Sequence, residues 1–169
     1  MAKHEHICYY NARGEIMKWI SHEIVSSVIV YAATDNLLYM AYSMIGTMLP
    51  DKLEGDPRKA RDYWNWRSKH RGWSHWPVPY LFFIAVLLLT EQKKLAGENF
   101  SAMATIGIFV MTGAVLHILE DAVCGKVPLI YLTQKIGIKL FAVGSFREYF
   151  FSMLIVCIIW IIKMAVLLK

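Results

Sequence analysis

A histidine and two acidic residues lie within one helical turn of an apolar stretch that ends LHILEDAV. His117 and Asp121 are four residues apart, so a helix would place them on one face, with Glu120 at its edge. An imidazole and a carboxylate so arranged can bind one cation, and ionisable groups at membrane depth usually face a partner or a polar cavity. The pair therefore suggests a metal site. The alternative is a helix end whose polar groups are solvated at a membrane surface.

A second group of candidate ligands lies in the segment KHRGWSHW. His70 and His75 are five residues apart, and Gly72 allows the chain to fold back, so both imidazoles can face one point. Ser74 is suited to cap a helix beginning at Pro77, which would place His75 at the positive end of that helix. That position favours neutral imidazole, the form that binds metals. The alternative is an aromatic belt at the membrane interface with incidental histidines.

Two further ionisable positions could join these groups. His22, followed by Glu23, lies at the start of the first apolar stretch, and Asp51 follows the apolar segment MLP. Taken singly, each is more often a cap or an interface residue than a ligand. We expect Glu54 and Asp56 to be solvated loop charges.

The composition is that of a membrane protein. The chain has 169 residues, of which 57% are hydrophobic and 18% charged, and its mean hydropathy is +0.40. Soluble domains are nearer about 45–50% apolar and about 25% charged, so a disordered chain is excluded and a soluble one disfavoured. The net charge of +5 indicates basic loops at a membrane surface rather than nucleic-acid binding. Three scattered cysteines are too few for a disulfide framework or a thiolate zinc cluster.

The elements that must position the candidate ligands are apolar stretches separated by charged loops. The first stretch, 20–49, is interrupted at 34–36 by Thr-Asp-Asn, residues that favour turns, so it is one long span or a hairpin of two shorter helices. The rest comprises a basic loop at 51–76, apolar stretches at 77–90, 101–123 and 150–168, and a mixed loop at 124–148. We predict an all-α integral membrane protein of one domain, 1–169. It would have about four to five membrane-embedded helices after a polar N-terminal segment, 1–19.

Topology would bring the candidate ligands to one face of the membrane. Two crossings separate the loop 51–76 from the end of the third apolar stretch, so both lie on the same side. The residues on that side are Asp51, His70, His75, His117 and Asp121. We predict a hairpin that turns near Asp35, because this turn also brings His22 to that face. Such a gathering favours a metal site over scattered solvated charges.

The distribution of basic residues predicts which side this is. The loop 51–76 contains Lys52, Arg58, Lys59, Arg61, Arg67, Lys69 and Arg71. The opposite loop near 91–100 has only Lys93 and Lys94. The positive-inside rule therefore places the site face in the cytoplasm.

Over roughly residues 20–150 the chain resembles the YdjM-type family of LexA-binding, inner membrane-associated metal-dependent hydrolases. The matching elements are His22, Leu49-Pro50-Asp51, the HRGWSH segment from His70 to His75, His117 with Asp121, and Gly144-Ser145-Phe146-Arg147-Glu148. HRGWSH is the most specific of them. The chain departs from the family at Asp51-Lys52-Leu53-Glu54, where L-P-D-x-D-H is common, and Glu54 is a candidate substitute for the missing aspartate. It also has Ala122-Val123-Cys124-Gly125 where a T-P segment is frequent.

The resemblance implies a function as well as a fold. The family is distantly similar to zinc-dependent phospholipase C and P1 nuclease, which implies a His/Asp metal cluster that acts on phosphoesters. We therefore expect a hydrolase of the bacterial inner membrane that acts on a phosphoester or lipid-linked phosphate through metal-activated water. Membrane lipid is the expected partner, and no nucleic acid is expected.

The residues expected to carry this chemistry form a short set. The metal, zinc by its donor set, would be held by His22, Asp51, His70, His75, His117 and Asp121. Glu148 would be a ligand or would orient one, and Arg71 would bind an anionic group. The alternatives are a non-catalytic membrane subunit with a structural metal, and a small transporter. The transporter is disfavoured because transporter sites lie near the midplane.

Overall fold

The computed structural model describes residues 5–55, 70–92, 98–141 and 145–168, with the backbone alone at 5–19 and 98–99. Asp56 and the basic residues between 58 and 69 lie outside these ranges. The first helix, α1 (Glu5–Thr34), extends well into the segment 1–19 that the sequence analysis treats as a separate polar region. The helical fold is confirmed, apart from one pair of two-residue strands that the sequence analysis did not predict.

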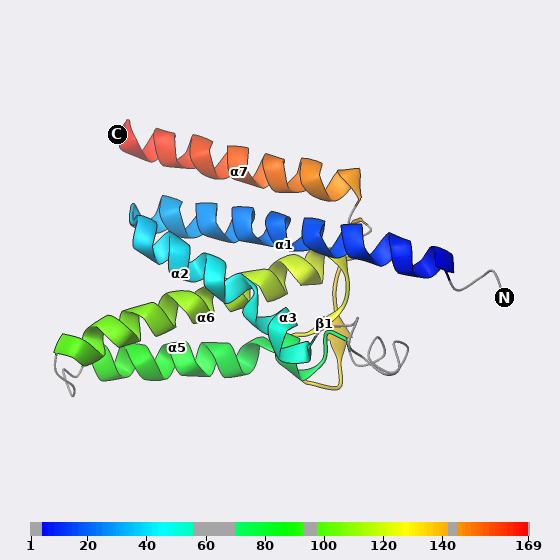
Figure 1. Ribbon diagram of the computed structural model, residues 1–169. Helices are drawn as coiled ribbons and strands as arrows, with labels where there is room; N and C mark the ends of the chain where they lie inside the picture. The colour runs from blue at the N-terminus through cyan, green and yellow to red at the C-terminus, as the bar shows by residue number, and fades with distance from the viewer. Residues whose placement is uncertain (1–4, 56–69, 93–97, 142–144, 169) are drawn as a thin grey trace.

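The predicted hairpin is present and turns where expected. α1 ends at Thr34, and α2 (Leu37–Thr47) runs back beside it (Figure 1). Asp35 has a φ of 54°, in the left-handed region that Asn and Asp tolerate better than most residues. The Asn36 side chain accepts hydrogen bonds from the amides of Leu38 and Tyr39, which caps α2. The hairpin places His22 at the same end of the molecule as Asp51.

The remaining elements follow in an up-and-down order. They are α3 (Leu49–Glu54), the 3-10 turn η2 (Trp73–His75), α5 (Pro77–Gln92), α6 (Glu98–Cys124), β1 (Val127–Pro128), β2 (Lys135–Ile136) and α7 (Phe146–Leu167). β1 and β2 are antiparallel, with Val127 opposite Ile136. Both strands lie at the end of the molecule that also holds α3 (Figure 1).

α6 is the central helix of the bundle, and glycines set its distance from α2. A Cβ on Gly113 would lie 2.1 Å from the carbonyl oxygen of Ser43, and a Cβ on Gly46 would lie 1.9 Å from that of Val110. Small residues allow helix backbones to approach closely, which matters in lipid, where apolar burial between helices gives little driving force. The close approach holds the end of α6 beside the α2–α3 connection.

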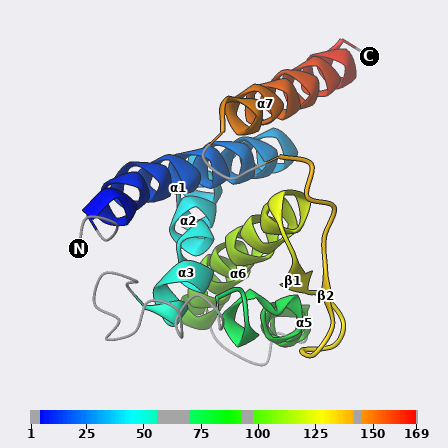
Figure 2. The ribbon, with the colours of Figure 1, turned by 90° about the vertical axis from the view of Figure 1, so that its right-hand side faces the viewer.

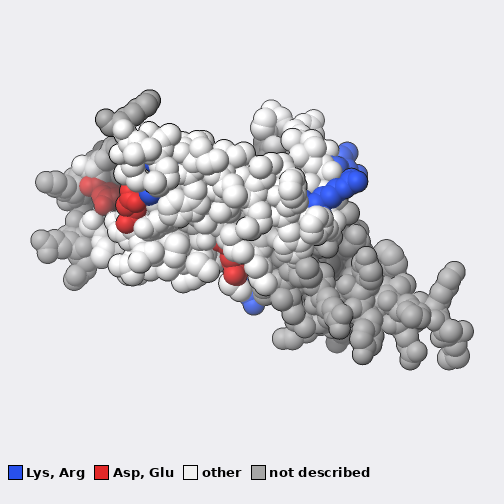
Figure 3. Space-filling model, turned by 90° about the horizontal axis from the view of Figure 1, so that it is seen from above, with Lys and Arg blue, Asp and Glu red and all other residues white. Residues whose placement is uncertain are grey.

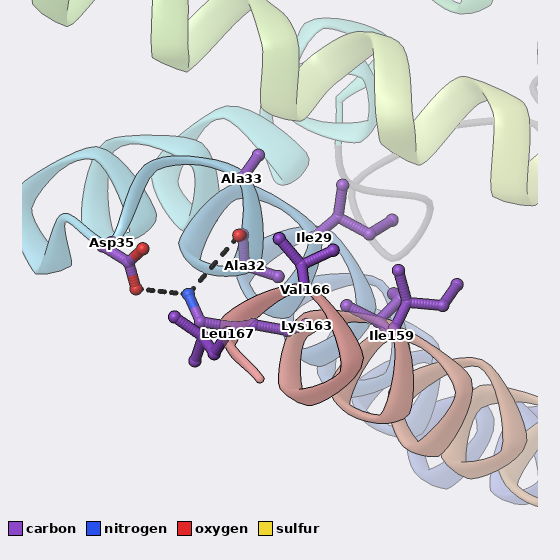
Figure 4. Close-up of a pocket in the computed structure, with 9 residues that line it drawn as sticks. Ile29, Ala32, Ala33, Asp35, Ile159, Lys163, Val166 and Leu167 are labelled. Atoms are coloured by element: carbon purple, nitrogen blue, oxygen red, sulfur yellow. Dashed lines mark hydrogen bonds and ion pairs between the residues drawn. The ribbon is translucent and has the colours of Figure 1, made fainter. Parts of the chain in front are cut away.

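α7 packs against α1 and is tied to the hairpin turn by a lysine. Figure 4 shows Lys163 reaching Asp35, with which it forms an ion pair, and the Ala32 carbonyl oxygen at 3.4 Å. The Lys163 ammonium also lies 4.9 Å from the centroid of the Tyr31 ring. A cavity of about 300 Å³ lies beside this pair, lined mainly by aliphatic residues of α1 and α7. Lys163 therefore has partners on α1 and at the hairpin turn.

Two of the described helices are long and apolar enough to cross a membrane, fewer than the four to five predicted. They are Phe100–Cys124 in α6 and Phe146–Leu167 in α7. The apolar parts of α1 (Ile20–Thr34) and of α5 (Pro77–Gln92) are shorter. At a rise of about 1.5 Å per residue they extend about 22–24 Å, less than a hydrocarbon core of about 30 Å.

Candidate metal centre

The candidate ligands converge on one end of the bundle. His22 comes from α1, Asp51 from α3, His75 from η2, and His117 and Asp121 from α6. Figure 2 looks onto this end, where α1, α3 and α6 surround a common centre. His22, His75, His117 and Asp121 are all at most 5% exposed as whole residues. Residues from four elements, separated by up to 99 positions between His22 and Asp121, thus share one buried site.

Two imidazole nitrogens each lie close to the same two carboxylate oxygens. His75 Nε2 lies 3.3 Å from Asp51 Oδ1 and 3.3 Å from Asp121 Oδ2. His117 Nε2 lies 3.7 Å and 3.8 Å from the same two oxygens. Zinc with ligands at about 2.0–2.2 Å implies ligand–ligand separations of roughly 3.3–3.6 Å in a tetrahedron. The four nitrogen–oxygen distances therefore match or slightly exceed those between ligands of one zinc ion.

A second, overlapping set includes the histidine that the hairpin brings in. Ligand atoms of His22, His117 and Asp121 all lie within 4.8 Å of one another. His22 Nε2 is 3.6 Å from Asp121 Oδ1, and the His22 and His117 ring centroids are 4.4 Å apart. Asp121 thus turns one carboxylate oxygen towards His22 and the other towards His75. A bridging carboxylate of this kind can serve one ion or two.

Buried nitrogens without hydrogen bonds mark the same place. Within the described part of the chain, both ring nitrogens of His117 and Nε2 of His75 have no hydrogen-bond partner. Leaving a buried polar atom unpaired costs about 1–3 kcal/mol, and native proteins rarely tolerate it. A metal ion bound to Nε2 of His75 and Nε2 of His117 would remove that cost for both atoms. The donor set is therefore suited to a metal on chemical as well as geometric grounds.

Glu54 organises the histidines and is not the solvated charge that we expected. Its Oε1 is 3.0 Å from His75 Nδ1 and accepts from the Ser74 hydroxyl at 2.8 Å, while its Oε2 is 2.5 Å from His70 Nδ1. The backbone amide of Gly72 also donates to Oε1, at 3.2 Å. A carboxylate that accepts from Nδ1 of a histidine fixes Nε2 as the metal-binding nitrogen. Glu54 therefore contacts the Nδ1 side of the His75 ring and leaves Nε2 facing the other candidate ligands. The Glu54 side chain is only 8% exposed.

Glu120 does the same for His22. Its Oε2 is 2.7 Å from His22 Nδ1, and its Oε1 accepts from the Ser26 hydroxyl at 2.9 Å. His22 Nε2 is thereby directed towards Asp121. The sequence analysis placed Glu120 on the edge of the ligand face but gave it no role.

The ionisable groups of the site that lie outside the candidate spans, His75, Asp51 and Glu54, favour a bound positive charge. Burial disfavours a charged His75, but the adjacent carboxylates of Asp121, Asp51 and Glu54 outweigh it and raise the pKa of His75 to about 11. Burial likewise opposes ionisation of Asp51 and Glu54, yet the adjacent imidazoles, His75 at Asp51 and His70 with His75 at Glu54, hold the pKa of both carboxyl groups below their usual values. Without a metal, a proton on the His75 imidazole supplies positive charge beside these carboxylates.

Arg71 is positioned against the site by an unusual backbone conformation. Its φ is 55°, and its guanidinium donates to Asp121 Oδ1 at 2.6 Å. A Cβ on Gly125 would lie 1.9 Å from Arg71 Nη1, so this glycine makes room for the side chain. Arg71 thus directly contacts a candidate ligand. Its predicted role in binding an anion stays a prediction.

His70 and Glu148 lie at the edge of the centre. The His70 ring is 5.8 Å from that of His75, but within the described residues His70 belongs to neither ligand set. Glu148, in the first turn of α7, is buried and lines a cavity of about 40 Å³ together with Ser21, His22 and Glu120. Both predicted roles for Glu148, ligand and orienting group, therefore remain predictions.

Comparison with known proteins assigns the chain to a family. The family of YdjM inner membrane proteins matches residues 17–167. No curated protein and no solved structure matches the chain. The expected similarity to zinc-dependent phospholipase C and P1 nuclease thus has no support from these comparisons and stays a prediction. Because the match covers most of the chain, this protein belongs to the family of YdjM inner membrane proteins.

Proposed function

We propose that the chain holds a zinc ion at the candidate metal centre and hydrolyses a phosphoester of the membrane in which it resides. The observation that carries the proposal is that Nε2 of His75 and of His117 each lie 3.3–3.8 Å from the same two carboxylate oxygens, with the four residues contributed by α3, η2 and α6. Two imidazoles and two carboxylates, without a thiolate, form a donor set that suits zinc or a similar divalent ion. The overlapping set at His22 offers room for a second ion.

The residues around the ligands support hydrolysis. A bound zinc ion would supply a water of lowered pKa and polarise a phosphoryl oxygen. Glu54 and Glu120 hold the imidazoles of His75 and His22 in the orientation that binds metal. Asp51, at 20% side-chain exposure, is the most open of the four central ligands. A substrate would therefore approach from the side of α3.

The proposed orientation follows from charge. The family is of the inner membrane, and α6 and α7 are the candidate spans. The two described ends of the basic loop 51–76, α3 and the segment from Arg71 to His75, contribute to the candidate metal centre. Positive residues remain on the cytoplasmic side, so the proposal places the centre there in a multi-pass protein.

One observation favours the non-catalytic alternative. Three of the four central ligands are almost inaccessible, with side-chain exposures of 0% for His75, 2% for His117 and 5% for Asp121. Structural zinc sites have four protein ligands, whereas catalytic sites keep one position open. A single zinc held by all four would stabilise the fold without catalysing a reaction.

Metal analysis combined with a phosphoester-hydrolysis assay, which follows the released chromogenic alcohol or inorganic phosphate, tests the proposal and separates the two functions. The purified full chain should contain at least one zinc per molecule, and His117→Ala should lose it, whereas His4→Ala should retain it. Zinc-dependent hydrolysis of a chromogenic phosphodiester or of phosphatidic acid, absent in His117→Ala, would establish the enzyme. Zinc without turnover would establish the structural alternative. Full zinc content in His117→Ala would refute both.

A further inference from the structure

The segment that connects the two candidate spans exposes an unusual number of large apolar side chains. In this connecting segment, residues 126–141, Ile138 is 69% exposed, Ile130 65% and Tyr131 64%. Leu132, Ile136 and Leu140 are also exposed. Outside a membrane, large exposed apolar patches usually mark a surface that another body covers. The connecting segment therefore needs an apolar partner.

The position of the connecting segment identifies the bilayer surface as that partner. α6 ends at Cys124, just before the segment, and α7 begins at Phe146, just after it. Since both helices are candidate spans, the segment between them is held where these spans leave the hydrocarbon. In Figure 2 it runs along one edge of the bundle, from beside α5 towards α7, rather than over its centre. It thus follows the circumference, where headgroups of surrounding lipids would lie.

The charge of the connecting segment indicates which lipids it would bind. Between Asp121 and Glu148 the sequence contains no acidic residue, but it contains Lys126, Lys135, Lys139 and Arg147. Figure 3 shows the largest group of blue atoms at the end of the molecule that holds the metal centre. Lysine side chains among apolar residues at an interface place their alkyl chains in the apolar layer and their ammonium groups at phosphates. Anionic phospholipids complement this pattern.

Hydrogen bonds fix the connecting segment to the elements that carry the ligands. The amides of Ile138 and Leu140 donate to the carbonyl oxygens of Ala122 and Val123 at 2.9 Å and 3.0 Å. These carbonyls belong to the end of α6, directly after Asp121. Lys135 Nζ donates to the His70 carbonyl oxygen at 3.0 Å. A lipid bound at the segment would therefore lie next to the metal centre.

We propose that residues 126–141 form an interfacial segment that inserts its exposed apolar side chains into the headgroup region and binds anionic phospholipids through its lysines. The lipid contact is independent of any metal. Its further role, presenting a lipid phosphoester to the candidate metal centre, rests on the proposed function. The proposal gives the protein a lipid-binding surface in addition to its spanning helices.

Photo-cross-linking in vesicles tests the lipid contact directly. Benzoylphenylalanine would replace Ile138 in the full chain, reconstituted in equal amounts of phosphatidylcholine and phosphatidylglycerol. The control carries the same group in place of Lys52, an exposed residue of the acid-containing helix α3. After irradiation, mass spectrometry should find several-fold more lipid adduct at position 138, with phosphatidylglycerol exceeding phosphatidylcholine. Adducts to a second copy of the chain, or no more lipid than at position 52, would overturn the proposal.

A charge variant and a chelator complete the design. In the background Lys126→Gln/Lys139→Gln the preference for phosphatidylglycerol should disappear while lipid adducts persist. Lys135 is left unchanged because it binds the His70 carbonyl. A preference that survives this double substitution would refute the role of the lysines. The whole experiment is repeated with chelated, metal-free protein, so failure of lipid binding is distinguished from failure of the metal site.

Discussion

The two ends of the bundle both bring charged side chains together, but they do so differently. At the far end one lysine, Lys163, meets one aspartate, Asp35, which is itself 68% exposed. At the site end three buried histidines face four acidic side chains, and three of their nitrogens have no hydrogen bond within the described residues. An ion pair that neutralises itself needs no ligand. A cluster of acceptors with unpaired imidazoles has the chemistry of a site for a cation.

Removal of a central metal ligand should have the largest effect of these changes. The effect should be limited to the site end of the bundle. His75→Ala should abolish zinc binding and with it the stabilisation that the ion gives, about 2.7 kcal/mol at a free zinc concentration about 100 times the Kd. Thermal melting with and without excess zinc measures this. Wild type should gain stability on addition of zinc and the variant should not. A zinc-dependent rise in Tm in His75→Ala would show that the ion binds elsewhere.

Loss of the supporting carboxylate should weaken the site without removing it. Glu54→Gln keeps the size of the side chain but loses the charge that holds the imidazole of His75, so zinc affinity should fall by about 10–100-fold. Competition with a chromogenic chelator gives the affinity. The matched control is Glu91→Gln, whose carboxylate accepts from Ser101 near the far end of α5 and α6. Equal zinc affinities in the two variants would show that Glu54 does not support the His75 imidazole.

A change between the two ends should affect stability more than binding. Gly113→Ala would place a Cβ 2.1 Å from the Ser43 carbonyl oxygen and force α2 and α6 apart, at a cost of about 1–3 kcal/mol. The control on the same helix is Gly107→Ala, whose Cβ meets only the end of the Leu87 side chain, at 2.8 Å. Denaturant unfolding in detergent should give a lower free energy of unfolding for Gly113→Ala than for Gly107→Ala. Equal stability would contradict the close helix contact.

The far-end ion pair should contribute least. Asp35→Asn removes the carboxylate partner of Lys163, but because Asp35 is largely exposed the loss should be below about 1 kcal/mol. Zinc content should equal that of wild type. A fall in zinc content would mean that the two ends are coupled through α1, contrary to the separation described above.

The parts of the site that depend on local sequence patterns were predictable. The hairpin was predictable because Thr34, Asp35 and Asn36 interrupt an apolar stretch, and Asn36 indeed caps α2. The pairing of His117 with Asp121 follows from their spacing of four residues. Counting the membrane crossings then placed Asp51 and His75 at the same end of the bundle as this pair.

The parts that depend on tertiary contacts were not predictable. Glu54 looked like a loop charge because its burial comes from Ser74 and His70, which only the return of the chain at Gly72 brings against it. Its position three residues after Asp51 in a helix was the one available signal. The partner of Lys163 required knowledge of how α7 packs on α1. The four to five membrane-embedded helices predicted include apolar stretches of 15 and 16 residues, whereas two of the described helices are long and apolar enough to cross a membrane.

X-ray absorption at the zinc edge of the purified protein tests the central claim most directly. Four nitrogen or oxygen ligands at about 2.0–2.2 Å are expected, with the outer-shell scattering of two imidazoles and no sulfur. In Asp51→Ala the edge should change as one oxygen ligand is lost, and in His75→Ala the imidazole scattering should fall or the zinc should be absent. A sulfur shell at about 2.3 Å, or protein free of zinc after growth in zinc-supplemented medium, would contradict the account.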